Sequence, residues 1–455
     1  MGSVCVTGDY VLTMDPRMPL VRNGGVVLED GEVVSVGRAE EVIEAHRPEL
    51  VVGGRWRLVM PGLVDAHVHT RERLAAFLFP DTVTSEEWMR RYAMPYHASL
   101  DEEAERVSVE LQLATMALQG VSLYVEAGYV HLRSHLEALG RIGLRAVLCP
   151  WLWDLSEFHR TAVDDVRRVA DELERAAGEL GGRVYCGLAP ISAATCSQEL
   201  IREAKGVADE RGWKFYIHAA STTSEVEHVR SRTGLTPIGY LDSLGVLDEN
   251  TVLVHAVYLD SDDVGRVLRS RAGVVACPLS GALKGKGLSR SSRFPDLLRA
   301  GARICVGTDG APSSRSFSPL RAASFLAMLL KDVTSDPSLL SAHDVISLAT
   351  TRASEVIGVG GVGRIAVGGP ADIAVFDLRS SPSLLPLGDP LQALAYGDVG
   401  STVEHLIVNG RFVVRDRVLV GVDLEALLER ASLLAEGLEE KLRKLRDLRP
   451  RGSGT

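Results

Sequence analysis

The feature of this sequence that most restricts its fold is a repeated alternation of short apolar runs with longer helical stretches between residues 61 and 361. Strands that alternate with helices in this way form parallel sheets, because each helix returns the chain to the starting edge. The strand candidates are residues 63–66, 122–126, 145–149, 184–188, 214–218, 252–255, 273–277 and 303–307. Eight such units predict an α/β fold of the (β/α)8 barrel type, with the active site at the C-terminal ends of the strands.

Both ends of the chain show a different pattern, in which short β-type runs alternate with turns. The N-terminal runs are residues 10–14, 25–28 and 32–36, and the C-terminal runs are residues 372–376, 405–408 and 411–414. Asp30-Gly31 and Asn409-Gly410 fit hairpin turns between such strands. We predict one small β-sandwich domain from residues 1–60 and 362–422, a barrel from residues 61–361, and a C-terminal helix over residues 423–448 with Asp423 as N-cap.

Charge and cysteine content limit the partners of the chain. A net charge of −10 argues against nucleic acid, whose phosphates are neutralised by clustered Lys and Arg. The 6 cysteines include no C-x-x-C pair, which predicts buried thiols in a reducing compartment. No targeting segment is apparent, and no apolar run approaches the roughly 20 residues that span a bilayer. We predict a cytoplasmic protein that acts on a small molecule, without nucleic-acid or membrane partners, and leave a homo-oligomer open.

Histidines stand at the ends of several predicted strands. His67 and His69 are separated by one residue, so in an extended chain both imidazoles face the same side. On spacing alone, a pair of surface or core histidines is an equal interpretation. Position decides between them, because His218 ends the fifth strand, His255 ends the sixth, and Asp309 follows the eighth within Gly-Thr-Asp-Gly. Three imidazoles and a carboxylate suit Zn²⁺ and leave a position for water, whose proton the carboxylate can take.

These motifs resemble the amidohydrolase superfamily, most closely its chlorohydrolase and adenosine-type deaminase branch. Residues 61–69 are similar to that branch's P-G-L-V-N-A-H-x-H segment, and residues 189–197 are similar to its A-P-H-S segment. Asp309 stands in the family's G-T-D-G motif, and residues 369–373 and 408–410 match its small β domain. The likeness therefore runs nearly from end to end.

The resemblance implies a site as well as a fold. It implies one divalent metal ion per chain, bound by His67, His69, His218 and Asp309, while His255 contacts the substrate or the hydrolytic water. Zinc is the expected ion, although the same ligands also suit Fe(II) or Mn(II).

The sequence departs from the family at several site positions. Deaminases of this branch carry H-x-x-E after the fifth strand, and here the motif ends in Ser221, which cannot carry a proton at neutral pH. Glu225 matches a helix position that the family also has after its own glutamate. The histidine of A-P-H-S is Ile191, and the acidic residue that contacts a ribose near position 95 is Tyr96 or His97. Adenosine-like substrates are therefore less expected.

Two carboxylates are candidates for the missing proton carrier. Asp309 acts alone in superfamily members that hydrolyse amide-like bonds, and Glu126 ends the second strand. Glu126 could instead form a salt bridge with Arg145 on the next strand. The predicted catalytic residues are Asp309, His255 and Glu126, and the predicted substrate-binding residues are Ser221, Arg145, Trp151 and His97.

Aromatic and basic residues follow other strands. Trp151 and Trp153 could form a wall against a planar substrate, with loop anchoring as the plainer interpretation. A basic cluster is most simply a solvated loop, although it could attract an anionic substrate; its residues are Lys284, Lys286, Arg290 and Arg293. Three histidines in polar, helix-like stretches are expected to be exposed, namely His159, His228 and His343.

We therefore predict a metal-dependent hydrolase that acts on a C–N bond, other than a peptide bond, of a small cyclic or amidine-like substrate by attack of metal-bound hydroxide. One alternative is an amide, carbamoyl or halogen-leaving substrate with Asp309 as sole acid and base. Another is a catalytically weakened protein that keeps the metal for binding only. Ammonia release from aminated heterocycles separates the first two, and turnover that chelation abolishes excludes the third.

Overall fold

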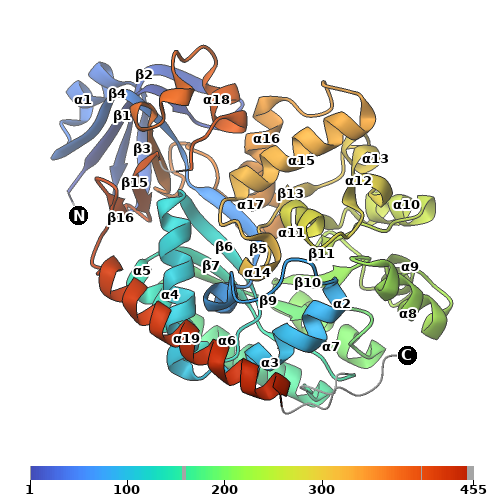
Figure 1. Cartoon of the computed structure of the whole chain (residues 1–455). Helices are drawn as coiled ribbons and strands as arrows, with labels where there is room; N and C mark the ends of the chain where they lie inside the picture. Colours follow the sequence, from blue (N-terminus) through green and yellow to red (C-terminus); the bar gives the residue numbers. More distant parts are fainter. Residues whose placement is uncertain (1, 156–159, 401, 448–455) are drawn as a thin grey trace.

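The structure is a computed structural model that describes residues 2–155, 160–400 and 402–447. Figure 1 shows a central barrel, with a sheet built from both chain ends beside it. His159, predicted to be exposed, lies outside the described residues. Within those residues, no helix combines the length and the apolar character needed to cross a membrane.

Parallel strands form the barrel, and in the described part of the chain they follow one another in sheet order. They are β5 (Leu63–Val68), β6 (Val121–Ala127), β7 (Arg145–Cys149), β9 (Val184–Pro190), β10 (Lys214–Ala219), β11 (Thr251–His255), β12 (Gly273–Ala276) and β13 (Ile304–Val306). A short strand, β8 (Trp151–Leu152), pairs with β9 off this path. Every predicted barrel strand is present, so the predicted fold class is confirmed.

The first and last barrel strands meet through a buried carboxyl. The Asp65 side chain accepts hydrogen bonds from the Thr308 backbone N–H at 2.9 Å and from the Thr308 hydroxyl at 2.5 Å. The Asp309 N–H donates to the His67 carbonyl at 2.8 Å. Gly307 allows this approach, because an added Cβ would lie 2.7 Å from the His67 Cβ. The closure therefore brings the ends of β5 and β13 side by side.

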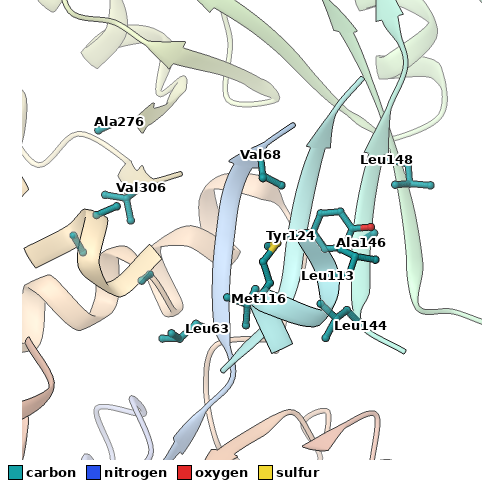
Figure 2. Packing of buried hydrophobic residues seen from close by; sticks show 14 of the residues in the cluster. Leu63, Val68, Leu113, Met116, Tyr124, Leu144, Ala146, Leu148, Ala276 and Val306 are labelled. Carbon is teal, nitrogen blue, oxygen red and sulfur yellow. The ribbon is translucent and has the colours of Figure 1, made fainter. Parts of the chain in front are cut away.

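Both faces of the barrel strands are apolar, as expected for a parallel sheet that is covered on both sides. Side chains from alternate positions fill the interior, including Val64, Ala66, Leu123, Val125, Val147, Val252, Val254 and Val275. On the outer face, Leu113 and Met116 of α4 (Glu102–Leu118) pack against Leu63, Tyr124 and Ala146 (Figure 2). The outward side chains therefore hold the surrounding helices.

Helices cover the outside of the barrel. Besides α4, they include α5 (Leu132–Ile142), α6 (Val166–Gly178), α7 (Gln198–Glu210), α8 (Thr223–Thr233), α9 (Pro237–Ser243), α10 (Ser261–Ser270), α13 (Phe294–Arg299), α15 (Pro319–Thr334), α16 (Ala342–Leu348) and α17 (Thr351–Ile357). Shorter helices lie in the loops after the strands: η1 (Thr70–Ala75), α2 (Ser85–Trp88), η2 (Met89–Ala93), α3 (Met94–His97), α11 (Pro278–Leu283), α12 (Leu288–Ser291) and α14 (Ala311–Ser314).

The two chain ends pair into one continuous sheet. In sheet order its strands are β17 (Val418–Leu419), β16 (Arg411–Arg415), β15 (Val403–Val408), β14 (Ile373–Asp377), β4 (Leu50–Pro61), β1 (Val4–Leu12), β2 (Leu20–Glu29) and β3 (Glu32–Arg38). The antiparallel pair β4–β14 joins the N-terminal part to the C-terminal part. Sequence reasoning missed β4, in which Gly53 and Gly54 interrupt the β-type pattern. α1 (Ala39–His46) packs on the sheet, whereas α18 (Pro390–Tyr396) packs against α15 and α16.

The chain ends in α19 (Leu424–Asp447), which runs along the outside of the barrel beside α4 (Figure 1). Its buried face includes Leu427, Leu438 and Leu442. Asp423 accepts a hydrogen bond from the Ala426 N–H at 3.0 Å, which confirms the predicted N-cap.

Candidate functional site

The predicted metal ligands lie together at the C-terminal ends of the barrel strands. The ligand atoms of His67, His69 and His218 lie within 4.8 Å of one another. Asp309 Oδ1 is 3.8 Å from His67 Nε2 and 3.4 Å from His69 Nε2, and Asp309 Oδ2 is 4.0 Å from His255 Nε2. Residues separated by more than 240 positions in the chain therefore converge at one point.

The backbone turns sharply where these strands end. His255 and Asp309 have φ angles of 77° and 65°, and Ala220, two residues after His218, has a φ of 52°. Such left-handed conformations are uncommon for residues with a side chain, and they concentrate at functional sites. Here they redirect the chain at the barrel mouth beside the ligand cluster.

The donor set fits one divalent ion. His69 Nδ1 lies 2.9 Å from the Ala127 carbonyl and His218 Nδ1 lies 2.8 Å from the Ile191 carbonyl, so an Nδ1–H can donate there and leave each Nε2 lone pair free. His67 Nε2 is buried and has no hydrogen-bond partner among the described residues. Two ligands of a tetrahedral zinc ion lie about 3.3 Å apart, close to the distance between His69 and Asp309.

Electrostatics agree with a ligand role for the imidazoles. Burial lowers the pKa of His69 to about 4 and holds the pKa values of His67 and His218 below the ordinary value for histidine. These imidazoles are therefore neutral at pH 7, which is the form that binds metal.

A cavity of about 630 Å³ opens above this cluster. Its apolar lining includes Trp88, Trp151, Trp153 and Ile191, and its polar lining includes Glu72, Ser221, Glu225, Lys284 and Lys286. A cavity of this size and mixed lining suits a small molecule rather than a polymer. The exposed His228 stands at its rim, in agreement with the predicted exposure.

The predicted substrate contacts Ser221 and Trp151 both line the cavity. The Trp151 ring stands edge-on to His69, with 5.6 Å between ring centroids, and it lies 5.6 Å from Trp153. The buried Arg71 guanidinium lies 3.8 Å from the centroid of the Trp151 ring. Arg71 therefore holds Trp151 in place beside the ligand cluster.

Arg145 is not at the site. It begins β7 at the opposite end of the barrel, where its guanidinium forms a bidentate pair with Asp372 at 2.7 and 3.2 Å. It also donates to the Asn409 side chain at 2.9 Å. The prediction that Arg145 binds substrate is wrong, because the first residue of a parallel strand lies away from the catalytic face. Its function is to join the barrel to the terminal sheet.

Glu126 is fully buried and is not part of the cavity lining. Its carboxyl accepts hydrogen bonds from the Thr70 N–H at 3.1 Å and the Thr70 hydroxyl at 2.5 Å, and Arg71 lies 3.8 Å away. Burial raises the pKa of Glu126 to about 8. The alternative pair with Arg145 is also wrong, and this placement favours positioning of the chain after His69 over catalysis.

His97 is buried behind the cavity wall rather than in it. Its Nε2 lies 3.0 Å from Glu72 Oε1, and Glu72 itself lines the cavity close to Gly310. Burial raises the pKa of Glu72. Sequence reasoning missed Glu72, although its position one helical turn after His69 was an available signal.

The basic loop after β12 is only partly solvated. Lys284 and Lys286 are 7% and 9% exposed and both line the cavity, whereas Arg290 is exposed. The interpretation of a solvated loop is therefore wrong for the two lysines. The signal was their place in the loop after the seventh strand, which often binds anions in such barrels.

Glu225 closes the start of α8. It accepts hydrogen bonds from the N–H groups of Ser221 at 2.7 Å and Ala220 at 3.2 Å, while its own N–H donates to the Thr222 hydroxyl at 3.2 Å. This reciprocal arrangement is a helix cap. It confirms that Glu225 occupies a helix position.

Comparisons with known proteins agree with this geometry. The Amidohydrolase family matches residues 58–413. A 5'-deoxyadenosine deaminase of Methanopyrus kandleri is 30% identical over 442 residues, which cover 96% of this chain and 98% of the relative. A 5-methylthioadenosine/S-adenosylhomocysteine deaminase of Haloarcula marismortui is 31% identical over 445 residues, which cover 97% of this chain and 99% of the relative.

Solved structures share the fold. A zinc-bound adenosine deaminase from Xanthomonas campestris superimposes with a TM-score of 0.89 at 22% identity, covering 96% of this chain and 98% of that one. A zinc complex of atrazine chlorohydrolase from Arthrobacter aurescens gives a TM-score of 0.85 at 19% identity. The match covers 95% of this chain and 100% of that one. The chain therefore belongs to the amidohydrolase family and is a metal-dependent hydrolase that acts on C–N bonds of small molecules.

Proposed function

We propose that this enzyme binds one divalent ion, in the first place zinc, through His67, His69, His218 and Asp309, and hydrolyses a C–N bond of a planar cyclic or amidine-like molecule. The observation that carries the proposal is the convergence of these side chains, with the Nε2 atom of His67 buried and unpaired among the described residues. Fe(II) or Mn(II) would satisfy the same ligands. When bound, such an ion supplies Lewis-acid activation of water and of the bond to be broken.

Proton transfer depends on Asp309 in this proposal. The Gly310 N–H donates to Asp309 Oδ1 at 2.7 Å and orients the carboxylate, while Oδ2 faces His255 at 4.0 Å. The carboxylate accepts a proton from the attacking water and returns it to the leaving group. Burial keeps the pKa of His255 well below its ordinary value, so its neutral ring is suited to hold the water or a substrate atom by a hydrogen bond.

Substrate orientation depends on the two sides of the cavity near the ligands. Trp151 and Trp153 offer aromatic surface for a planar ring. Ser221 lies where deaminases of this branch carry a carboxylate, and its hydroxyl can donate or accept one hydrogen bond with a ring heteroatom. A hydroxyl does not release its proton at neutral pH, so it orients the substrate without protonating it.

A second candidate follows from the same residue. Because Ser221 faces the cavity and supplies no acid, an amide, carbamoyl or halogen-leaving substrate is favoured over a ring amine that must be protonated. Asp309 would then act as the sole acid and base. For this reason we expect slow deamination of 5'-deoxyadenosine and 5-methylthioadenosine, the compounds in the names of the relatives.

The test is a turnover assay of zinc-loaded protein with matched ring compounds. Each ring is offered with an amino, an amide and a chloro substituent, and release of ammonia or chloride is measured with and without a chelator. Turnover of at least one member that chelation abolishes supports a metal-dependent hydrolase, and the preferred leaving group separates the two candidates. Equal rates with and without metal would contradict the proposal, and metal binding without any turnover would indicate the catalytically weakened alternative.

A further inference from the structure

Two lysines on the cavity wall have no place in the mechanism above. Lys284 directly follows α11 and Lys286 comes two residues later, in the loop after β12. Both are buried to more than nine-tenths of their surface, and both line the cavity that contains the metal ligands. Neither ammonium group has a hydrogen bond or a salt bridge among the described residues, and the Lys284 ammonium lies over the Trp88 ring, 4.8 Å from its centroid. Buried charges in proteins are normally paired, so this arrangement requires an explanation.

The carboxylates of the cavity already have other partners. Asp309 belongs to the metal-binding cluster, and Glu72 is bonded to His97. Glu225 accepts hydrogen bonds from two backbone N–H groups at the start of α8. Glu86 accepts a hydrogen bond from the hydroxyl of Ser224 in α8. A divalent ion beside Asp309 would add further positive charge. With a neutral substrate, the negative charges near the lysines would be Glu72, Glu225 and Asp309, and none of these carboxylates is within salt-bridge distance of either ammonium group in the described part of the chain.

The burial of the lysines also has an electrostatic cost. Burial, followed by the nearby Arg315, lowers the pKa of Lys284. Two ammonium groups so close to each other and to Arg315 repel one another unless an anion lies between or beside them. By contrast Arg290, on the same loop, remains exposed to water.

The position of the pair in the barrel suggests how a substrate would lie. Trp151 follows β7, the third strand of the barrel, and the lysines follow β12, the seventh. In a ring of eight strands the third and the seventh are diametrically opposite, so the aromatic surface and the lysines face each other across the mouth.

We propose that Lys284 and Lys286 form an anion-binding subsite, which holds a carboxylate or phosphate group of the substrate while its planar part lies against Trp151. The inference deepens the proposed function and rests on it, because it concerns the substrate of the same cavity. It predicts that the natural substrate is a planar molecule with an acidic substituent. Carboxylate and phosphate share the oxygen acceptors that ammonium groups bind.

The test measures binding rather than turnover. The metal-loaded protein is titrated with benzoate and with its neutral counterpart benzamide, and with phenyl phosphate and its neutral counterpart phenol, by quenching of tryptophan fluorescence. The variants are the double substitution Lys284→Met and Lys286→Met, the charge-preserving double substitution Lys284→Arg and Lys286→Arg, and the matched control Arg290→Met on the exposed part of the loop. Circular dichroism and metal content are recorded for each.

The wild type should bind one or both anionic probes more tightly than their neutral counterparts, and the tighter of the two identifies the anion. The methionine variant should lose about tenfold or more of that affinity. The arginine variant should retain most of it, and Arg290→Met should stay within about twofold. Because a phosphate can also bind a metal ion directly, the titrations are repeated after chelation, and the dependence on the lysines should persist.

Equal dissociation constants for wild type and methionine variant, or no preference for the anionic probes, would overturn the inference. If the methionine variant does not fold, the single substitutions Lys284→Gln and Lys286→Gln give the same comparison. Failure of the proposed function is separate, because it appears as missing metal or missing turnover, whereas this inference is decided by probe binding to folded protein with or without metal.

Discussion

Asp309 is the residue on which both metal binding and proton transfer depend in the proposed function. Its two oxygens face different partners, because Oδ1 lies near His67 and His69 while Oδ2 lies near His255. A carboxylate in this position can contact the ion and still exchange a proton. An isosteric amide can still contact the ion but cannot exchange a proton.

Asp309→Asn should remove nearly all turnover while the fold is retained. General-base assistance is typically worth about 10²–10⁴-fold in rate, and the amide cannot accept the proton. The measurement is kcat on whichever ring compound is turned over, with the melting temperature as a check on folding. Asp332→Asn, the same substitution at an exposed position of α15, should leave the rate unchanged. A rate for Asp309→Asn close to wild type would assign the base to another residue.

Ser221 is the residue that limits which leaving group the enzyme can release. Its hydroxyl lies in the cavity but carries no dissociable proton at neutral pH. Ser221→Glu should therefore raise ammonia release from at least one aminated heterocycle, because a carboxyl can protonate the ring nitrogen.

Ser221→Gln is the matched control, since it has the size of the glutamate without its proton. Ammonia release should rise in the first variant and not in the second, measured as kcat/KM on the same heterocycle. Efficient deamination of 5'-deoxyadenosine by the wild type would count against this view of Ser221.

At the scale of elements, the start of α8 contains a carboxyl in an unusual state. Glu225 is half-buried against the amides of Ala220 and Ser221, and this partial burial raises its pKa from 4.5 to about 7. A carboxyl with a higher pKa in the folded than in the unfolded chain binds more protons when folded. Its contribution to stability is then complete below pH 4.5 and is lost as the pH rises to about 7.

Glu225→Gln should remove this pH dependence. A shift of this size corresponds to about 3 kcal/mol. The unfolding free energy of the wild type should therefore fall, relative to that of the variant, by up to this amount between pH 4.5 and pH 7.5, and should change little above. Urea unfolding of both proteins at several pH values measures the difference, and a constant offset between them would show that Glu225 does not titrate in this range.

At the scale of the whole molecule, the metal site connects strands from both halves of the barrel. His67 lies in β5 and His69 follows it, His218 belongs to β10, and Asp309 follows β13. An ion bound by all of them stabilises the folded barrel in proportion to its affinity, because the unfolded chain does not offer the same site.

Elemental analysis should find about one divalent ion per chain, and its removal by chelation should abolish turnover and lower the melting temperature by several degrees. His67→Ala should lose the ion and its stabilisation. His228→Ala, which removes an exposed imidazole at the cavity rim, should retain both. Protein without metal after expression in zinc- and iron-replete medium would contradict the assigned ligands. A cytoplasmic location and a homo-oligomeric state stay predictions.

The terminal sheet and the barrel are connected by contacts that lie far from the cavity. Arg145 at the start of β7 is paired with Asp372 and Asn409, which flank strands of the terminal sheet. The chain ends therefore cover the N-terminal side of the barrel strands, while the loops at the opposite side remain available for the site.

The sequence by itself determined the barrel strands, the terminal sheet apart from β4 and β17, the C-terminal helix and the convergence of the five ligand-type residues. These features follow from local patterns. An apolar run of the right length forms a strand wherever it lies, and parallel strands bring their C-terminal ends to one face. His67, His69, His218 and Asp309 stand at the ends of such strands. Their convergence therefore follows from the strand pattern and does not depend on the loops.

Only the tertiary structure decided which residues of the loops face the cavity. The sequence indicates which loops hold Lys284, Lys286 and Glu72 but not that their side chains line the cavity, whereas Glu126 is turned towards Thr70 behind it. The environment of a loop side chain depends on segments distant in the chain that fold over the same mouth. Local sequence periodicity does not predict such contacts. Whether a charged loop side chain is buried, and which group it pairs with, is therefore determined only by the closed barrel.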